Sequence, residues 1–341
     1  MSKILVTGGL GFIGSHTVVE LVNAGYEPVI VDNLSNSSEK ILGQLTKILG
    51  FEPVFYKTEL CNEQEVAELA AKEPELEGII HFAASKAVGE SVQKPLMYYK
   101  NNFFSLINLL KAYQGKKLNF VFSSSCTVYG QPDELPVTEK APVKKAQSPY
   151  GNTKQVAEEI LQDVIASGSN YKIISLRYFN PVGAHQSALI GELPIGVPQN
   201  LVPFITQTAI GKRQKLTVFG DDYNTPDGSN VRDYIHVVDL AKAHVAALRY
   251  MDTASDFNGY DIFNIGTGKG SSVLEVIHAF EKATGVKLNY EIGPRRPGDV
   301  EKVWGDVTKA VEKLKWKTEL GLDEMMLSAW NWEKYINENP L

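Results

Sequence analysis

A tyrosine and a lysine four residues apart, Tyr150 and Lys154, are the pair in this chain best suited to proton transfer. On a helix such residues share one face, and an ammonium there favours the phenolate of a tyrosine, whose ordinary pKa is about 10. The pair also occurs by chance on surface helices. It gains weight from Ser125, which lies near the end of a predicted strand 25 residues earlier and can hydrogen-bond the oxygen that exchanges a proton. Together the three residues predict acid–base chemistry at an oxygen atom.

Three glycines, Gly8, Gly11 and Gly14, follow the first apolar run and open a helical pattern. Glycines at this spacing allow a tight turn and a close approach of the backbone to a pyrophosphate. Asp32 ends the next predicted strand, 18 residues beyond Gly14, and no arginine follows it at 33–36. Its carboxylate can accept from an adenosine ribose and would repel a 2′-phosphate. A purely structural glycine turn is the alternative, but the strand, helix and aspartate together favour an NAD site.

These residues need a scaffold to hold them, and the sequence alternates two kinds of element. Runs rich in β-branched residues predict strands at 3–7, 28–32, 53–57, 78–82, 118–123 and 171–177. Helical patterns lie between them at 12–24, 39–49, 63–72, 95–113 and 151–165. This alternation predicts an α/β fold with a Rossmann-type doubly wound parallel sheet over residues 1–180.

The pattern changes near residue 180, where a polar stretch rich in glycine and proline begins. It is followed by helical patterns at 201–210, 239–251, 272–283 and 322–337, and by short strand patterns at 216–219, 233–237, 262–265 and 288–292. We expect residues 181–341 to form a smaller C-terminal α/β domain that binds the substrate, with some later segments returning to the first domain.

The composition argues against several classes of protein. The 341 residues include 34 Lys and Arg against 40 Asp and Glu, so a net charge of −6 offers no basic surface to nucleic acid or a membrane. No apolar run of about 18 residues predicts a membrane span, and the start of the chain lacks the pattern of a signal peptide. The two cysteines, Cys61 and Cys126, suit a reducing compartment, and the six histidines show no metal-ligand spacing. We expect a cytoplasmic protein with no metal site.

The motifs together resemble a known family. The glycine turn at 7–14, the serines at 123–125 and the Tyr150/Lys154 pair are similar to those of the extended short-chain dehydrogenases/reductases. Longer stretches narrow the resemblance to the UDP-glucose 4-epimerases: residues 32–37, 86–91, 148–151, 177–181, 227–237 and 295–299. The resemblance covers essentially the whole chain. It implies an NAD-dependent enzyme of galactose metabolism that interconverts UDP-glucose and UDP-galactose through a 4-keto sugar.

The same resemblance assigns roles to single residues. Tyr150 would act as acid and base at the sugar's 4-hydroxyl, Ser125 would hold the same oxygen, and Lys154 would tune Tyr150 while bridging to the nicotinamide ribose. The cofactor would be contacted by Gly8, Gly11, Phe12, Ile13, Gly14, Asp32, Asn33, Leu34, Ser35, Asn36, Ser37, Glu59, Leu60, Phe82, Ala83, Ala84, Lys86, Asn101, Ser125, Tyr150, Lys154 and Phe179. One position departs from the family: Glu59 stands where epimerases commonly have an aspartate that meets adenine, and it would reach the adenine amino group with a longer side chain.

On the substrate side the resemblance implies contacts to the UDP-sugar by Ser125, Tyr150, Asn180, Asn200, Leu201, Leu216, Thr217, Val218, Arg232, Arg296, Asp299 and Val303. Arg232 and Arg296 suit a diphosphate because they are permanently charged, although solvated surface arginines are the alternative. Val303 would face the sugar. Because valine is much smaller than tyrosine, it leaves room for the acetamido group of UDP-N-acetylglucosamine and UDP-N-acetylgalactosamine. Packing beneath Trp304 is the alternative for Val303.

Other functions have to be weighed against this one. A nucleotide-sugar 4,6-dehydratase carries an Asp-Glu pair just after the catalytic hydroxyl, and this chain has Cys126 and Thr127 there. A UDP-pentose or UDP-uronate epimerase of the same family is another alternative. A non-catalytic NAD-sensing protein would need none of Ser125, Tyr150 and Lys154. The resemblance also implies a homodimer that pairs through the helices at 95–113 and 151–165.

Overall fold

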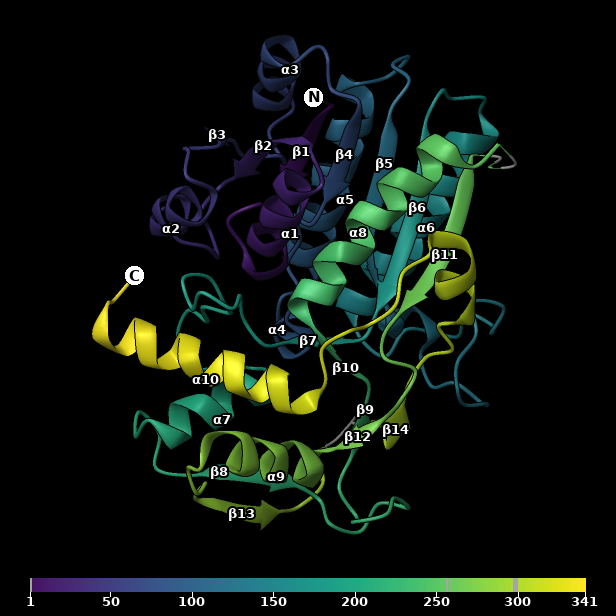
Figure 1. Cartoon of the computed structure of the whole chain (residues 1–341). Coiled ribbons are helices and arrows are strands. Elements are labelled where there is room, and N and C mark those ends of the chain that lie inside the picture. Colours follow the sequence, from purple (N-terminus) through teal and green to yellow (C-terminus); the bar gives the residue numbers. More distant parts are fainter. Residues whose placement is uncertain (1, 256, 258, 297–299) are drawn as a thin grey trace.

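The core of the protein is a seven-stranded parallel sheet, seen in a computed structural model that describes residues 2–255, 257, 259–296 and 300–341 (Figure 1). The strand order is β11-β6-β5-β4-β1-β2-β3. The strands are β1 (Lys3–Thr7), β2 (Glu27–Asp32), β3 (Val54–Lys57), β4 (Gly78–His81), β5 (Asn119–Ser125), β6 (Lys172–Tyr178) and β11 (Tyr260–Ile265). The predicted Rossmann-type doubly wound α/β class is confirmed.

Helices cover both faces of this sheet. One apolar cluster joins it to α1 (Phe12–Asn23), α2 (Lys40–Leu49) and α8 (Val237–Thr253), and another joins it to α3 (Glu63–Lys72), α5 (Pro95–Ala112) and α6 (Pro149–Ala166). The short helix α4 (Val88–Gln93) precedes α5. Successive strand residues point to opposite faces, so Ile4 and Val6 belong to the first cluster and Leu5 to the second. Burial on both faces explains the nearly continuous apolar strands.

Two boundaries differ from the sequence prediction and matter for the site. Strand β5 runs on to Ser125 and is followed by a 3₁₀ turn over Cys126–Tyr129. Helix α6 begins at Pro149, because the Ser148 hydroxyl accepts a hydrogen bond from Gly151 N at 3.1 Å and proline suits the first helical position. Tyr150 therefore lies in the first turn of the helix.

After residue 180 the chain builds a smaller body with shorter strands, drawn below the sheet in Figure 1. It contains the parallel pairs β7 (Asn180–Val182) with β10 (Tyr234–His236) and β8 (Leu216–Phe219) with β13 (Tyr290–Gly293). A third sheet has β9 (Val231–Arg232) between β12 (Ser271–Ser272) and β14 (Lys302–Val303). The helices are α7 (Leu201–Ala209), α9 (Val273–Thr284) and α10 (Leu322–Glu338), with a π-helical turn at Ala310–Leu314.

Two elements of the C-terminal half pack with the N-terminal half. Strand β11 pairs with β6 at the edge of the large sheet, and α8 packs against α1. Strand β10 is shorter than the predicted strand at 233–237, since Val237 already begins α8. Within the described residues, no helix is long and apolar enough to cross a membrane.

Candidate active site

The turn between β1 and α1 is closely packed around its glycines. Gly8 has a φ of +66°, and a Cβ on Gly14 would lie 2.2 Å from the carbonyl oxygen of Gly8. A Cβ on Gly8 would lie 3.0 Å from the backbone nitrogen of Ala83, in the loop after β4. The first turn of α1 has neither an acidic residue nor a side-chain cap. Its free N–H groups, at Phe12 and Ile13 among others, are therefore suited to bind a phosphate.

Asp32 connects this turn to the loop that follows β2. Its Oδ2 accepts from Leu10 N at 3.1 Å, and its Oδ1 accepts from Leu34 N at 2.9 Å and from the Ser37 hydroxyl at 2.7 Å. The carboxylate is buried. Since a carboxylate has about four acceptor positions, these three bonds leave capacity for a ribose hydroxyl. Leu34 adopts a φ of +63°, which the bonded loop has to hold in place.

Glu59 lies on the neighbouring loop after β3 and reaches back to the same region. Its two oxygens accept from Asn33 Nδ2 at 2.8 Å and from Cys61 N at 2.9 Å. Burial alone would raise the pKa of Glu59, but the hydrogen bonds from Cys61 and Asn33 hold it below its ordinary value. The longer side chain thus stays ionised and ties two loops together. Leu60 is buried beside it.

The loop after β4 forms the next part of the site. Its first residues are fixed on β1, because Phe82 N donates to Thr7 O at 3.1 Å and Ala83 N donates to the Thr7 hydroxyl at 3.2 Å. Asn101 of α5 donates to the Ser85 hydroxyl at 3.2 Å. The predicted cofactor residues of β1, β4 and α5 are therefore neighbours at the carboxyl ends of the parallel strands, the edge where ligands of such sheets bind.

Sequence reasoning missed Glu192, which contacts two of the predicted residues. Its carboxylate accepts from Asn200 Nδ2 at 2.6 Å and pairs with Lys86 Nζ at 3.5 Å. Lys86 was predicted on the cofactor side and Asn200 on the substrate side. Glu192 thus links the two sides, and no local pattern in the sequence marks it.

The predicted catalytic set comes together at the end of β5. Tyr150 is buried, and Ser125 is close enough to lower the pKa of its phenol. Lys154 is also buried, and its Nζ lies 5.9 Å from the centroid of the Tyr150 ring and 4.8 Å from that of Phe122. Its ammonium donates to Ser123 O at 2.6 Å. The helix and the strand thus place a phenol, a hydroxyl and an ammonium side by side.

Burial acts on both titratable groups of the set. It raises the pKa of Tyr150 well above the ordinary value, the nearby Tyr178 adds to this rise, and the bond from Ser125 opposes it. Burial lowers the pKa of Lys154 to about 7, and the carboxylate of Glu158 opposes that change. Tyr150 can become a base only if positive charge stabilises its phenolate. Lys154 is the group in position to supply that charge.

The predicted nucleotide residues lie on the smaller body. Asn180 opens β7, and its N donates to Asp233 O at 2.9 Å. Arg232 of β9 is half-buried, and its Nη1 donates to Val231 O at 2.9 Å. Arg296 is exposed, and its guanidinium carbon lies 5.5 Å from the centroid of the Phe219 ring. Asp299, predicted to contact the UDP-sugar, lies outside the described residues.

The other predicted nucleotide contacts fall into two groups. Asn200 is the residue before α7, exposed, with Leu201 beginning that helix. On β8, Leu216 and Val218 are buried in the core of the smaller body, whereas Thr217 is half-buried. The two apolar residues can therefore offer a ligand only their backbone groups.

Val303 is mostly buried, at 9 % exposure, in an apolar cluster with Phe179, Tyr129 and Val128. Sequence reasoning missed the residue that orders the loops around this cluster. Asp233 accepts from Thr267 N at 2.8 Å and from Gly268 N at 3.2 Å. In the described ranges, no group of His, Cys, Asp and Glu is arranged to hold a metal ion.

Comparison with known proteins gives a consistent result. A family model described as GDP-mannose 4,6 dehydratase matches residues 5–328. The chain is 52% identical to UDP-glucose 4-epimerase 1 of Oryza sativa subsp. japonica over 346 residues, which covers 100% of this chain and 96% of that protein.

Two solved structures have the same fold over nearly their whole length. One is a UDP-glucose 4-epimerase from Stenotrophomonas maltophila with bound NAD and formylated UDP-arabinopyranose, with a TM-score of 0.95 and 45% identity, covering 99% of this chain and 100% of that one. The other is the UDP-glucose 4-epimerase from Bifidobacterium longum in complex with NAD+ and UDP, with a TM-score of 0.93 and 46% identity, covering 100% of both chains.

Proposed function

The chain belongs to the UDP-glucose 4-epimerase family, within the extended short-chain dehydrogenases/reductases, and we infer that it interconverts UDP-glucose and UDP-galactose with NAD as its cofactor. The resemblance predicted from the motifs is confirmed by full-length identity to such epimerases. The observation that carries the function is the arrangement of Ser125, Tyr150 and Lys154 at the end of β5, on the same sheet edge as the glycine turn that follows β1.

The residues at the carboxyl edge of the large sheet fit NAD. The Gly14 backbone leaves no room for a side chain, and the uncapped start of α1 offers N–H donors to a pyrophosphate. Asp32 keeps an acceptor position for the adenosine ribose and carries the charge that disfavours a 2′-phosphate. Bound there, NAD would supply a reversible acceptor for the hydride of the sugar's carbon 4.

The proton is handled by the chain's own residues. Tyr150, as phenolate, takes the proton of the 4-hydroxyl, and Ser125 hydrogen-bonds the same sugar oxygen so that it keeps its place. Lys154 stabilises the phenolate with its charge. Tyr150 then holds the proton while carbon 4 is a ketone, and it returns the proton to the oxygen when the hydride comes back to the other face of the ring.

Inversion requires that the sugar turn while the nucleotide stays bound. We propose that residues 1–180 bind NAD and that residues 181–341, apart from α8 and β11, hold the UDP-sugar. Arg232 and Arg296 would bind the diphosphate, with Asn180, Asn200 and the backbone of β8 around the nucleotide. Anchoring on the nucleotide, and not on the hexose, leaves carbon 4 free to present either face to the cofactor.

The direct test is to incubate the purified protein with UDP-galactose without added cofactor and to look for UDP-glucose. An epimerase that retains NAD forms it, and a transient absorbance of reduced nicotinamide accompanies turnover. A dehydratase would instead release a dehydrated 4-keto sugar, and a sensor would convert nothing. UDP-xylose and UDP-glucuronate in parallel assays separate the pentose and uronate epimerases.

The dehydratase alternative is disfavoured by the residues after Ser125. Removal of water across carbons 5 and 6 needs further acid–base groups. Here Cys126 follows, and burial raises the pKa of its thiol to about 12. Thr127, the next residue, is not acidic.

We further propose that the enzyme accepts N-acetylated UDP-hexoses. The support is Val303, a small side chain at the position that the family resemblance places against the sugar. It packs in one apolar cluster with Phe179 and the partly buried Cys126. Equal amounts of enzyme assayed with UDP-N-acetylglucosamine and UDP-glucose test this directly. No conversion of the N-acetyl sugar would refute it.

The assembly we propose is a homodimer through α5 and α6, which pack side by side on one face of the sheet. Large apolar side chains are exposed on and just before α5: Val92, Leu96 and Phe104 at 62 %, 82 % and 49 %. Exposed apolar patches of this kind commonly mark protein interfaces. Sedimentation of the wild type and of Leu96→Glu would test it, since the variant should shift toward monomer.

We also propose a cytoplasmic location. Cys61 and Cys126 are both free thiols, as expected in a reducing compartment. Fractionation of cells with an antibody to this chain would test the location.

A further inference from the structure

Helix α6 contacts the end of β5 through three side chains on one face. Tyr150, Lys154 and Glu158 are spaced by four residues, so each lies about one turn after the previous one. Each is matched with a different residue of a consecutive serine run. Ser125 lowers the pKa of Tyr150, Lys154 Nζ donates to Ser123 O at 2.6 Å, and the Ser124 hydroxyl donates to Glu158 Oε1 at 2.5 Å. The proposed mechanism uses the first two of these side chains, but not Glu158.

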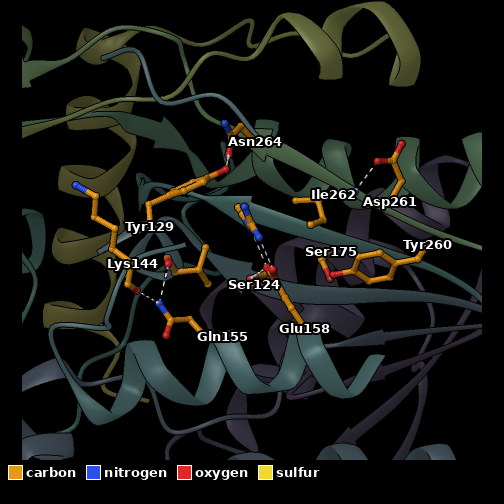
Figure 2. Close-up of polar contacts among 12 residues, drawn as sticks. Ser124, Tyr129, Lys144, Gln155, Glu158, Ser175, Tyr260, Asp261, Ile262 and Asn264 are labelled. Carbon is orange, nitrogen blue, oxygen red and sulfur yellow. Dashed lines mark hydrogen bonds and ion pairs between the residues drawn. The ribbon is translucent and has the colours of Figure 1, made fainter. Parts of the chain in front are cut away.

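Glu158, labelled near Ser124 in Figure 2, forms a buried ion pair with Arg177 of β6. Arg177 Nε donates to Oε1 at 2.9 Å, and Nη2 donates to Oε2 at 2.5 Å, a two-point contact. Ser124 and Arg177 are register partners on the adjacent strands β5 and β6. Both charged side chains are about 3 % exposed. Glu158 therefore connects α6, β5 and β6 at a single carboxylate.

The surroundings of Arg177 extend this connection to the segment after Ser125. The guanidinium carbon lies 4.8 Å from the centroid of the Tyr129 ring, and the Tyr129 hydroxyl donates to Asn264 Oδ1 at 2.7 Å. Tyr129 ends the 3₁₀ turn that follows β5, and Asn264 lies on β11. The Glu158 carboxylate is thus fixed between α6, β5 and β6.

Stability alone does not account for such a pair. Two charges lose their hydration on burial, and replacing a buried ion pair by apolar residues is often neutral or stabilising. What apolar residues could not supply is a fixed negative charge one helical turn from Lys154. We propose that Glu158 is a positioning residue of the epimerase reaction, which keeps Lys154 charged and in place beside Tyr150. This inference rests on the proposed function.

The charges around Lys154 favour this role. Tyr150 and Glu158 face it from α6, and His81 of β4 interacts with it electrostatically. Burial lowers the pKa of His81 to about 3, so this histidine is neutral at working pH. Arg177, on β6, is bonded to Glu158. Burial lowers the pKa of Lys154 to about 7 against the opposing effect of the Glu158 carboxylate. Without Glu158 the pKa of Lys154 falls further, so the lysine is charged less often and favours the phenolate less.

The test replaces both partners, because removing one would leave a buried unpaired charge. The double variant Glu158→Gln/Arg177→Met is compared with wild type in kcat/KM for UDP-galactose across pH. In the pH profile of kcat/KM, the rise that follows deprotonation of Tyr150 (the Tyr150 limb) should move up by about one pH unit. Below this limb, kcat/KM should fall about tenfold. On the plateau at higher pH, kcat/KM should recover. If this variant does not fold, Glu158→Met/Arg177→Leu makes the same change of charge.

Two controls separate the charge from the packing. Ser124→Ala removes one hydrogen bond to the same carboxylate but leaves its charge, and the limb should stay where it is. Glu333→Gln alters another buried carboxylate, which accepts from Thr206 at 3.1 Å and from Lys212 at 2.8 Å away from the catalytic set. The rise of kcat/KM with pH should not move in Glu333→Gln either. A folded double variant with an unshifted limb, or a shift as large in Glu333→Gln, would overturn the proposal.

A second readout does not depend on turnover. The absorbance of tyrosinate in the NAD-loaded protein is titrated with pH, and Tyr150 is isolated by subtracting the same titration of Tyr150→Phe. The midpoint for Tyr150 should rise in the Glu158→Gln/Arg177→Met background, and an equal midpoint would again overturn the role of Glu158. A wild type that fails to convert UDP-galactose would overturn the proposed function instead, and this titration would still judge Glu158.

Discussion

The catalytic edge of the large sheet and the nucleotide side of the smaller body are built in opposite ways. Ser123, Ser124 and Ser125 are consecutive residues of one seven-residue strand, and their partners lie on one face of one 18-residue helix. The predicted nucleotide residues come from β7, α7, β8, β9 and the loops around β14, of which the strands have two to four residues. The proposed catalytic groups are buried, whereas Asn180, Asn200 and Arg296 are exposed.

This difference follows from what each region has to do. Proton and hydride transfer tolerate little misplacement, and a site on packed, regular elements is more exact than one on loops. A nucleotide is held by many separate polar contacts, which can be collected from several short segments. Mutations at the catalytic edge of the large sheet should therefore change the rate and its pH dependence. Mutations on the nucleotide side of the smaller body should change substrate choice and affinity.

The largest effect is expected at Tyr150. Tyr150→Phe removes the acid–base group and should lower kcat by about 10²–10⁴-fold, because general acid–base catalysis contributes that much. Binding of NAD and UDP should stay the same, since the ring and its packing remain. Turnover and equilibrium binding are measured on the same preparation. A variant within a few-fold of wild type in kcat would mean that the catalytic edge was wrongly identified.

Lys154→Met should produce the next largest effect, and one that depends on pH. A neighbouring opposite charge shifts a pKa by about 1–3 units, so losing the ammonium raises the pKa of Tyr150 further and lowers kcat/KM about 10–10³-fold below the rising limb. The rate should partly recover at high pH. A uniform loss at every pH would instead point to a binding defect.

The same variant has a stability signature with a defined sign. Folded Lys154 has a pKa of about 7, against about 10.4 for an unfolded lysine. Between these values the unfolded chain binds more protons than the folded one, so the stability of the wild type rises as pH rises through this interval. Lys154→Met should lack that rise. Chemical unfolding at pH values on both sides of the interval measures it.

A smaller effect, restricted to the sugar, is expected at Val303. Val303→Tyr forces additional atoms into a packed cluster, which costs about 1–3 kcal/mol and so lowers activity on UDP-N-acetylglucosamine about ten- to a hundredfold. Activity on UDP-glucose should be kept. The measurement is kcat/KM for both sugars, and Val303→Leu serves as the matched apolar control. Equal losses on both sugars would favour a packing role beneath Trp304.

The smallest effect is expected at Asp32, on the affinity for the cofactor. Asp32→Ala removes a charged acceptor, a loss that weakens NAD binding by about tenfold, and it reduces the discrimination against NADP. Asp32→Asn is the matched variant, because it keeps an acceptor but not the charge. Reconstitution with each dinucleotide reports the ratio. An unchanged ratio in both variants would assign the selectivity to another residue.

The parts of the protein that the sequence predicted are those encoded over short stretches of chain. Alternating strands and helices predicted the sheet from β1 to β6, since each element follows from its own hydrophobic period. The glycine turn, Asp32 and the pair of Tyr150 and Lys154 lie within or next to single elements. Glu158 follows Lys154 by four residues, which places it on the same helix face. The spacing alone does not predict its role, because a charged residue on a helix is more often exposed to solvent.

Only the tertiary structure decided what depends on segments distant in sequence. The bond of Glu158 to Ser124 joins residues 34 positions apart, and Lys86 meets Glu192 across more than a hundred. The return of β11 to the edge of the large sheet, next to β6, is of the same type. Such contacts arise because packing brings together elements whose own patterns carry no mark of their neighbours. The chain therefore determines its elements and its chemistry locally, while burial and register determine how charged each catalytic group is.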